Sequence, residues 1–275
     1  MMPVKALILT GYGLNCDYET EYALKLAGAE TLKMHINDVI EDSGKILKDC
    51  HILVFGGGFS WADDHGAGVI FASKIKFNIG DRINEFIEKG NLVIGICNGF
   101  QSLVNLGLLP GFNNNYTERR VALTNNDRGN FIDCWVNLKV NQESNCVFTK
   151  GMDTIELPVR HAEGKFFASE KDIDRLFNSN QVVMQYAEKE GNPAKGTWPF
   201  NPNGSTRDIA GISDPTGRIF GLMPHPEGFH SYMNHPDWTG KKERLAREGQ
   251  NLESKEGDGI RIFRNAVNYI KDTVS

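Results

Sequence analysis

One cysteine lies in a setting that suits a nucleophile. Cys97 is at the centre of the run Gly95-Ile96-Cys97-Asn98-Gly99, where an apolar strand-like stretch at 92–96 gives way to an apolar stretch with helical spacing. This pattern predicts a nucleophile elbow, a sharp strand-to-helix turn whose flanking glycines let strand and helix approach without Cβ clashes. The helix N-terminus beyond the turn would favour a thiolate. The alternative is a buried, inert cysteine after a core strand.

A base and its orienting group are offered by the segment Pro224-His225-Pro226-Glu227. A cysteine nucleophile needs a base within hydrogen-bond reach and a third group that orients the base. The two prolines disfavour helix, so we expect an extended segment in which His225 and Glu227 point to the same side. The alternative is a histidine of a surface loop. Because this segment and Cys97 both follow strand-like runs, they are predicted to meet at the carboxyl edge of one sheet.

A third segment, Gly56-Gly57-Gly58-Phe59-Ser60, follows the strand-like run 52–55. Bare backbone N–H groups are what a developing oxyanion requires, so this segment is predicted to supply an oxyanion hole. A phosphate loop is the competing interpretation. Neither the P-loop pattern nor the dinucleotide-binding glycine pattern occurs at a strand-to-helix junction, so we expect no nucleotide site in this chain.

These motifs need a scaffold that brings strand ends together. The apolar patterns predict strands at 4–9, 30–36, 52–55 and 92–96, alternating with helices at 17–27, near 43–48 and before Gly90. Such alternation predicts an α/β fold with a mostly parallel sheet and helices on both faces. A two-residue apolar period at 131–140 predicts an antiparallel extension. The remaining expected elements are strands at 182–186, 209–212 and 219–223, the last two as a hairpin, and a final helix at 260–270.

Composition narrows the class of protein. The 275 residues leave room for one large domain, and we expect a single domain over 1–275. A net charge of -5 with scattered lysines and arginines disfavours nucleic acid, and no apolar stretch is long enough to span a membrane. Five cysteines without CxxC spacing predict a reducing cytoplasm. No metal is expected, because His230, His235 and Asp237 match no defined ligand spacing.

The three motifs together resemble triad-type (class I) glutamine amidotransferases. Further blocks resemble the glutaminase of phosphoribosylformylglycinamidine synthase, an enzyme of purine biosynthesis. These blocks are Leu108-Leu109-Pro110-Gly111, Cys146-Val147-Phe148-Thr149, His161-Ala162-Glu163-Gly164-Lys165 and Asn201-Pro202-Asn203-Gly204-Ser205. In that family the glutaminase frees ammonia from glutamine and passes it to a synthetase, which uses ATP to convert formylglycinamide ribonucleotide into the amidine.

The resemblance implies roles for individual residues. Cys97 would be the nucleophile, His225 the base and Glu227 its orienting group. The remaining implied roles are the N–H groups of Gly57 or Gly58 and of Asn98 in the oxyanion hole, Gln101 and Phe59 near the bound glutamine, and His161 and Glu163 on a loop that closes the pocket. A solvated charged turn is the alternative for these last two residues.

The resemblance also implies partners. They are a formylglycinamidine ribonucleotide synthetase, which holds ATP and Mg²⁺, together with a small accessory subunit, and no cofactor is implied in this chain. One departure from the family pattern is a charged stretch at about 229–258, expected to be a loop-rich insertion before the final helix. The alternatives are the glutaminase of another amidotransferase, a stand-alone γ-glutamyl hydrolase or cysteine peptidase, and a catalytically silent binding protein.

Overall fold

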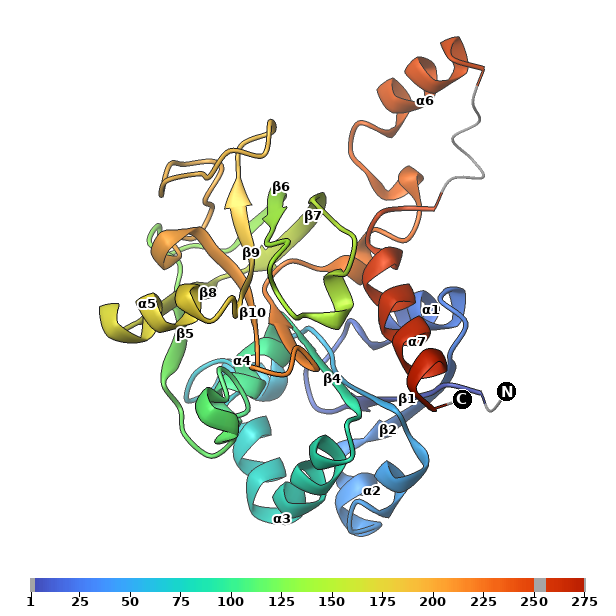
Figure 1. Cartoon of the computed structure of the whole chain (residues 1–275), viewed down its shortest axis with the longest axis vertical. Helices are drawn as coiled ribbons and strands as arrows, with labels where there is room; N and C mark the ends of the chain where they lie inside the picture. The colour runs from blue at the N-terminus through green and yellow to red at the C-terminus, as the bar shows by residue number, and fades with distance from the viewer. Residues whose placement is uncertain (1–2, 250–255, 275) are drawn as a thin grey trace.

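A nine-stranded mixed sheet forms the centre of the molecule (Figure 1). The computed structural model describes residues 3–249 and 256–274. The strand order is β2-β1-β3-β4-β11-β10-β9-β6-β7. The strands of this sheet are β1 (Lys5–Thr10), β2 (Glu30–His35), β3 (Ile52–Phe55), β4 (Leu92–Ile96), β6 (Ile132–Val140), β7 (Thr154–His161), β9 (Val182–Ala187), β10 (Ile209–Ser213) and β11 (Ile219–Leu222).

The first five strands in the spatial order are parallel, and the others extend the sheet in antiparallel fashion. The parallel strands β3, β4 and β11 are buried at every position, as expected for strands covered on both faces. Strand β6 instead alternates over much of its length between buried and partly exposed residues. The predicted α/β sheet, its antiparallel extension and the β10–β11 hairpin are confirmed.

Helices cover both faces of the parallel part. Helices α1 and α7 pack together on one face, and α3 packs against α4 on the other (Figure 1). The right-handed β1-α1-β2 and β3-α3-β4 crossovers run in opposite directions along the sheet, which puts their helices on opposite faces. The helices are α1 (Asp17–Leu26), α2 (Ile36–Glu41), α3 (Val69–Glu88), α4 (Asn98–Leu106), α5 (Glu170–Asn178), α6 (Trp238–Arg247) and α7 (Ile260–Val274).

Three local expectations differ from the structure. The short helix expected near 43–48 is a 3-10 helix at Lys45–Asp49, and an α-helix that was not expected, α2, precedes it, capped by the His35 imidazole, which accepts from Asn37 N at 3.2 Å. A small antiparallel sheet of β5 (Val121–Asn125) and β8 (Glu163–Ala168) was not expected. The stretch at 229–258 contains helix α6, so its expected loop-rich character is wrong at that point; residues 250–255 lie outside the described residues.

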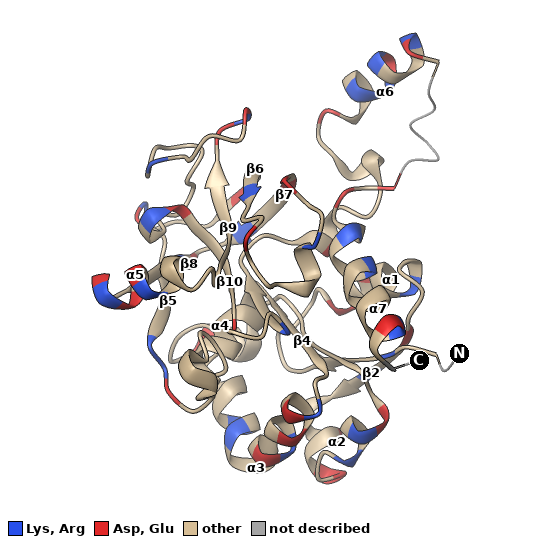
Figure 2. Cartoon of the chain, in the orientation of Figure 1, with Lys and Arg blue, Asp and Glu red and all other residues tan. Residues whose placement is uncertain are grey.

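Helix α6 projects away from the sheet, whereas α7 returns to it (Figure 1). Basic and acidic side chains mix along α6, and none of its residues is buried (Figure 2). Its mostly polar sequence explains why the helix was not predicted. No helix within 3–249 or 256–274 has the length and apolar character needed to cross a membrane.

Candidate active site

Cys97 occupies a sharp turn between β4 and α4. Its backbone has φ 51° and ψ −107°, a conformation that L-residues adopt only where the surrounding structure enforces it. A Cβ at Gly99 would lie 1.9 Å from the carbonyl oxygen of Phe55, and one at Gly95 would lie 2.7 Å from the Gly99 backbone. Both flanking glycines are therefore required for the close approach of helix and strands, as the predicted elbow demands.

Strand β11, which leads into the histidine segment, is hydrogen-bonded directly to the Cys97 turn. Cys97 N donates to Leu222 O in β11 at 2.8 Å, and two residues later in the chain the Pro224–Glu227 segment begins. His225 N in turn donates to Pro158 O in β7 at 2.8 Å. The Cys97 side chain is buried, and its Sγ lies 3.8 Å from Arg160 O in the same strand β7. Strands β4, β11 and β7 thus fix the backbone of the cysteine and the histidine relative to each other.

His225 and Glu227 form a buried pair. His225 Nδ1 and Glu227 Oε1 are 2.5 Å apart, and each residue is only 2% exposed. The spacing predicted this contact, but the chain reaches it through a 3-10 turn at Pro226–Gly228 instead of the extended segment expected. Pro226 stands at the first position of that turn, where its missing N–H costs no hydrogen bond. The Nδ1 atom of His225 therefore faces the Glu227 carboxylate.

The electrostatics of this pair favour a charged imidazole. Burial alone lowers the pKa of His225, but the adjacent Glu227 carboxylate and the neighbouring Cys97 act in the opposite sense, and the net effect raises the pKa well above its ordinary value. His225 Nε2 has no hydrogen-bond partner among the described residues. This nitrogen is therefore available to exchange a proton with a reacting group.

The glycine segment after β3 lies beside the imidazole. A Cβ built on Gly57 would be 2.8 Å from His225 Cε1, so no larger residue fits there without moving the ring. Gly58 has φ +139°, and its Cβ would lie 2.7 Å from Gly13 O. Asn98, the first residue of α4, has a backbone N–H without an intrahelical partner. The structure brings all three predicted oxyanion-hole residues to the sheet edge that carries Cys97 and His225.

A polar network surrounds the start of α4. Asn98 Nδ2 donates to Asp63 Oδ1 at 2.9 Å and to Gln101 Oε1 at 3.2 Å, and Gln101 Nε2 donates to Glu163 O at 2.7 Å. Burial, followed by the nearby Glu163 carboxylate, raises the pKa of Asp63 to about 6. Sequence reasoning missed Asp63, since it lies in an irregular turn where no periodicity marks it.

His161 and Glu163 occupy strand ends. The expectation of a pocket-closing loop is wrong in its local structure, because His161 ends β7, Glu163 begins β8 and a single residue separates them. His161 is buried, with Nδ1 3.0 Å from Asn126 Oδ1, and burial together with the charge of His225 lowers its pKa to about 3. Phe59 is 40% exposed and packs near Phe131.

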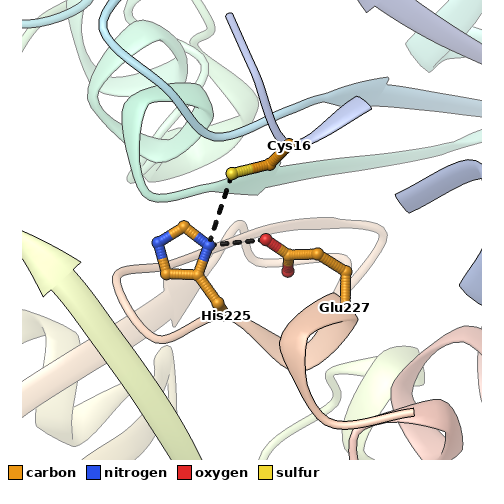
Figure 3. Close-up of side chains that lie close together, drawn as sticks. All are labelled: Cys16, His225 and Glu227. Carbon is orange, nitrogen blue, oxygen red and sulfur yellow. Dashed lines mark hydrogen bonds and ion pairs between the residues drawn. The ribbon is translucent and has the colours of Figure 1, made fainter. Parts of the chain in front are cut away.

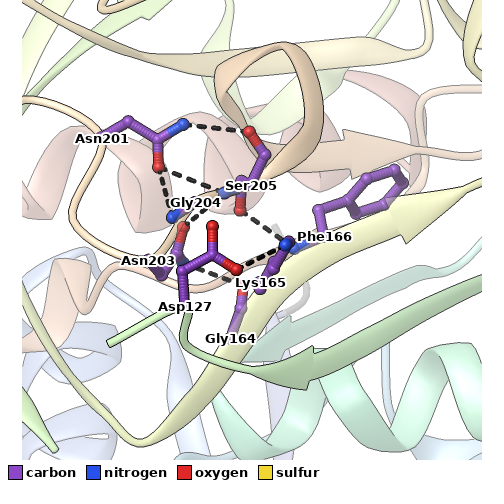
Figure 4. A network of polar contacts seen from close by, with 8 residues as sticks. All are labelled: Asp127, Gly164, Lys165, Phe166, Asn201, Asn203, Gly204 and Ser205. Carbon is purple, nitrogen blue, oxygen red and sulfur yellow. Dashed lines mark hydrogen bonds and ion pairs between the residues drawn. The ribbon is translucent and has the colours of Figure 1, made fainter. Parts of the chain in front are cut away.

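Strand β8 is held by the segment 201–205 (Figure 4). Asn203 Nδ2 donates to Gly164 O and Ser205 Oγ accepts from Phe166 N, both at 2.9 Å. Asn201 Oδ1 accepts from the backbone of Gly204 and thereby closes the segment on itself. The Asn-Pro-Asn-Gly-Ser block therefore positions the strand that begins with Glu163.

A second cysteine lies at the same imidazole. Cys16 Sγ is 4.0 Å from His225 Nδ1, on the side where Glu227 also approaches (Figure 3). Burial raises the pKa of this thiol. Sequence reasoning gave Cys16 no role, because only tertiary structure brings the loop before α1 to the end of β11. Among the described residues, His230, His235 and Asp237 do not form such a group: His235 Nε2 lies 3.0 Å from Glu156 Oε2, and the His235 ring meets Trp135 edge-on.

Nearly the whole chain matches a known protein family. Residues 3–270 match the CobB/CobQ-like glutamine amidotransferase domain. The chain belongs to this family.

Individual relatives agree with that assignment. The phosphoribosylformylglycinamidine synthase subunit PurQ of Methanococcus maripaludis is 47% identical over 265 residues, which cover 96% of this chain and 97% of the relative. The protein of the same name from Dehalococcoides mccartyi is 45% identical over 271 residues, with 98% and 99% covered. The resemblance to this glutaminase, stated above from the motifs, is confirmed.

Solved structures agree as well. A chain in the structure of PurLQS from Thermotoga maritima has a TM-score of 0.69 and 28% identity, and the match covers 98% of this chain and 100% of that one. A putative GMP synthase protein from Thermoplasma acidophilum, at 13% identity and a TM-score of 0.55, shares the fold; the match covers all of both chains.

Proposed function

We propose that this chain is the glutaminase of phosphoribosylformylglycinamidine synthase, with Cys97 as nucleophile, His225 as base and acid, and Glu227 as the group that orients His225. The observation that carries this proposal is the buried His225–Glu227 pair at 2.5 Å, on a strand whose end is hydrogen-bonded to the strained Cys97 turn. A nucleophile, a base and an orienting carboxylate at one sheet edge are what thiol-based amide hydrolysis requires. The near full-length PurQ relatives support the same conclusion.

The proposed reaction has two halves. In the first, the Cys97 thiolate, paired with the protonated His225, attacks the side-chain amide carbon of glutamine, and His225 Nε2 then gives its proton to the departing nitrogen to release ammonia. The backbone N–H groups of Gly57 or Gly58 and of Asn98 stabilise the oxyanion, each such donor contributing about 3 kcal/mol to the transition state. In the second half, the now neutral His225 deprotonates a water that cleaves the glutamyl thioester, which gives glutamate and restores the Cys97 thiolate and the protonated His225.

The residues around this centre shape the glutamine pocket. We propose that Gln101 and Phe59 contact the substrate, since Gln101 is fixed beside Asn98 and Phe59 follows the glycine segment. Glu163 holds Gln101 through its backbone oxygen and brings a carboxylate near Asp63. His161, buried and bonded to Asn126, supports the wall behind His225. Its low pKa keeps it neutral, so it adds no positive charge next to a protonated His225.

The chain contains neither of the two glycine-rich nucleotide-binding patterns, so the ATP-dependent step that uses the ammonia is assigned to another protein. We propose that a formylglycinamidine ribonucleotide synthetase, which holds ATP and Mg²⁺, receives the ammonia, and that a small accessory subunit completes the complex. The similarity to a chain of PurLQS supports these partners. The chain would act as one domain, from which helix α6 projects. All five cysteines in the described residues are free, which supports work in the reducing cytoplasm.

The test separates ammonia supply from ammonia use. Wild-type chain and Cys97→Ala are each reconstituted with the synthetase, and amidine formation is measured with glutamine or with a high concentration of ammonium. Cys97→Ala should lose the glutamine-dependent reaction and keep the ammonium-dependent one, because the synthetase step does not involve this thiol. Cys50→Ala, with its thiol at the far end of β3, is the matched control and should keep both. Equal loss with both nitrogen sources, in a folded and bound Cys97→Ala complex, contradicts the proposal.

A further inference from the structure

Cys16 is fixed next to the catalytic imidazole. Its backbone N donates to Gly57 O at 3.3 Å, and its carbonyl oxygen accepts from Thr20 Oγ1 at 2.6 Å and Thr20 N at 3.1 Å. These bonds hold the residue at the start of α1, with its sulfur 4.0 Å from His225 Nδ1 (Figure 3). The reaction proposed above uses His225 and Glu227 together with Cys97, and it leaves Cys16 without a chemical role.

Three different metal-ligand types meet at this point. One ligand atom each from Cys16, His225 and Glu227 lies within 4.8 Å of the others. Glu227 is 2% exposed, yet its Oε2 has no hydrogen-bond partner among the described residues. A buried carboxylate oxygen without a partner is costly unless something occupies it. Thiolate sulfur, imidazole nitrogen and carboxylate oxygen are the ligand atoms that Zn²⁺ takes in proteins.

We propose that Cys16, His225 and Glu227 form a regulatory site for a thiophilic divalent cation, Zn²⁺ in the first place, and that the bound cation switches off glutamine hydrolysis. Binding of the cation stands on the geometry of these three residues alone. Its inhibitory effect rests on the function proposed above.

The site needs only small movements to accept the cation. With Zn–S at ~2.3 Å and Zn–N and Zn–O at ~2.1 Å, tetrahedral angles put sulfur and nitrogen about 3.6 Å apart, and nitrogen and oxygen about 3.4 Å apart. The sulfur must therefore approach His225 from 4.0 Å, and the carboxylate must withdraw from 2.5 Å. Side-chain rotations of Cys16 and Glu227 supply both changes, and a water would complete the four ligands.

The bound cation would disable His225 by occupying one ring nitrogen and leaving the proton on the other. The Cys16 thiol releases its proton to solvent on binding. The proton on His225 Nδ1 gives way to the cation, so the neutral imidazole carries its single proton on Nε2. That nitrogen then cannot serve as the base that takes a proton from the water of the second half-reaction, and Glu227 no longer orients the ring. The catalytic base is blocked without any contact between the cation and Cys97.

In a competing arrangement, the cation would bind the thiol of the nucleophile Cys97 together with His225 Nε2. The two arrangements differ in which thiol they need, so single cysteine variants distinguish them. Cys50 lies at the far end of β3 and serves as the control thiol. The full-length chain, reduced and freed of metal, is titrated with Zn²⁺ in competition with a chromogenic chelator and with Co²⁺, whose absorption reports thiolate ligation.

Wild type, Cys50→Ala and Cys97→Ala should each bind one Zn²⁺, and Cys16→Ala should bind it more than about 100-fold more weakly, since even loss of an outer partner of a metal site costs about 10- to 100-fold. Without metal, Cys16→Ala should hydrolyse glutamine as wild type does, and Zn²⁺ should inhibit wild type but leave Cys16→Ala active. Absence of binding in wild type, equal binding by Cys16→Ala, or loss of binding in Cys97→Ala instead overturns the site. Failure of metal-free wild type to hydrolyse glutamine contradicts the proposed function and leaves the binding result standing by itself.

Discussion

Gly57→Ala should inactivate the enzyme through a single methyl group. The new Cβ would lie 2.8 Å from His225 Cε1, whereas carbon atoms in contact are about 3.5 to 4.0 Å apart. The ring must therefore move by about 0.7 to 1.2 Å. The backbone of His225 cannot follow freely, because its N–H donates a hydrogen bond to Pro158 O. A displacement of about 1 Å at a reacting group costs about 100-fold in rate, or about 2.7 kcal/mol. The backbone N–H of residue 57 is retained, so the oxyanion donor itself is not removed.

The matched control is the preceding glycine. A Cβ on Gly56 meets no atom within 4 Å, and neither glycine has a positive φ, so Gly56→Ala should leave turnover unchanged. Glutamate release from glutamine is measured for both variants with the synthetase present, together with thermal unfolding. Overpacking should cost Gly57→Ala about 1 to 3 kcal/mol of stability, which leaves it folded at the assay temperature. Wild-type turnover in folded Gly57→Ala, or an equal loss in Gly56→Ala, refutes the placement of His225 against this glycine.

Further variants test other parts of the site. His225→Asn should lower turnover by about 10⁶-fold and Glu227→Gln by about 10⁴-fold, because losing the base costs more than losing its orienting group; near wild-type turnover in both contradicts the triad. Since the pKa of Asp63 is raised to about 6 from 3.8, the folded chain binds more protons between these values and loses stability as pH rises. Asp63→Asn should therefore gain stability over wild type from about pH 4 to about pH 7 in thermal unfolding, and a pH-independent difference contradicts this. Gly204→Ala, at φ +79° and with its Cβ 1.9 Å from Asp127 Oδ2, should lose about 1 to 3 kcal/mol by denaturant unfolding, whereas unchanged stability argues against strain there.

The parts of the fold that follow local rules could be predicted from the sequence. The elbow at Cys97 combines an apolar strand, a following stretch whose apolar residues recur at helical spacing, and two glycines, all close together in the sequence. The contact of His225 with Glu227 was likewise predicted from their two-residue spacing across Pro226, although a 3-10 turn and not an extended segment brings it about. Alternating elements then determine a parallel sheet, whose carboxyl edge collects these motifs.

The rest depends on contacts between distant segments. Cys16 reaches His225 from across the chain, and Asp63 owes its raised pKa to burial and to Glu163, a residue of another strand. The β5–β8 pairing joins two segments that flank the long β6–β7 hairpin, so no local pattern reveals it. Helix α6 was missed for another reason: it is mostly polar and buries no residue, so its few apolar residues gave little indication of a helix.

The most direct test of the central claim is to ask which thiol reacts as the nucleophile. Cys97 and Cys16 both lie at His225 and both precede a helix, so their expected chemical difference rests on the strained strand-to-helix turn that Cys97 occupies and on the burial that raises the pKa of Cys16. The full-length chain with its synthetase is treated briefly with a glutamine-like electrophile, and the labelled peptide is identified by mass spectrometry. The account predicts label on Cys97, lost in Cys97→Ala and retained in Cys16→Ala. Rapid label on Cys16, or labelling of Cys97→Ala at the wild-type rate, contradicts it.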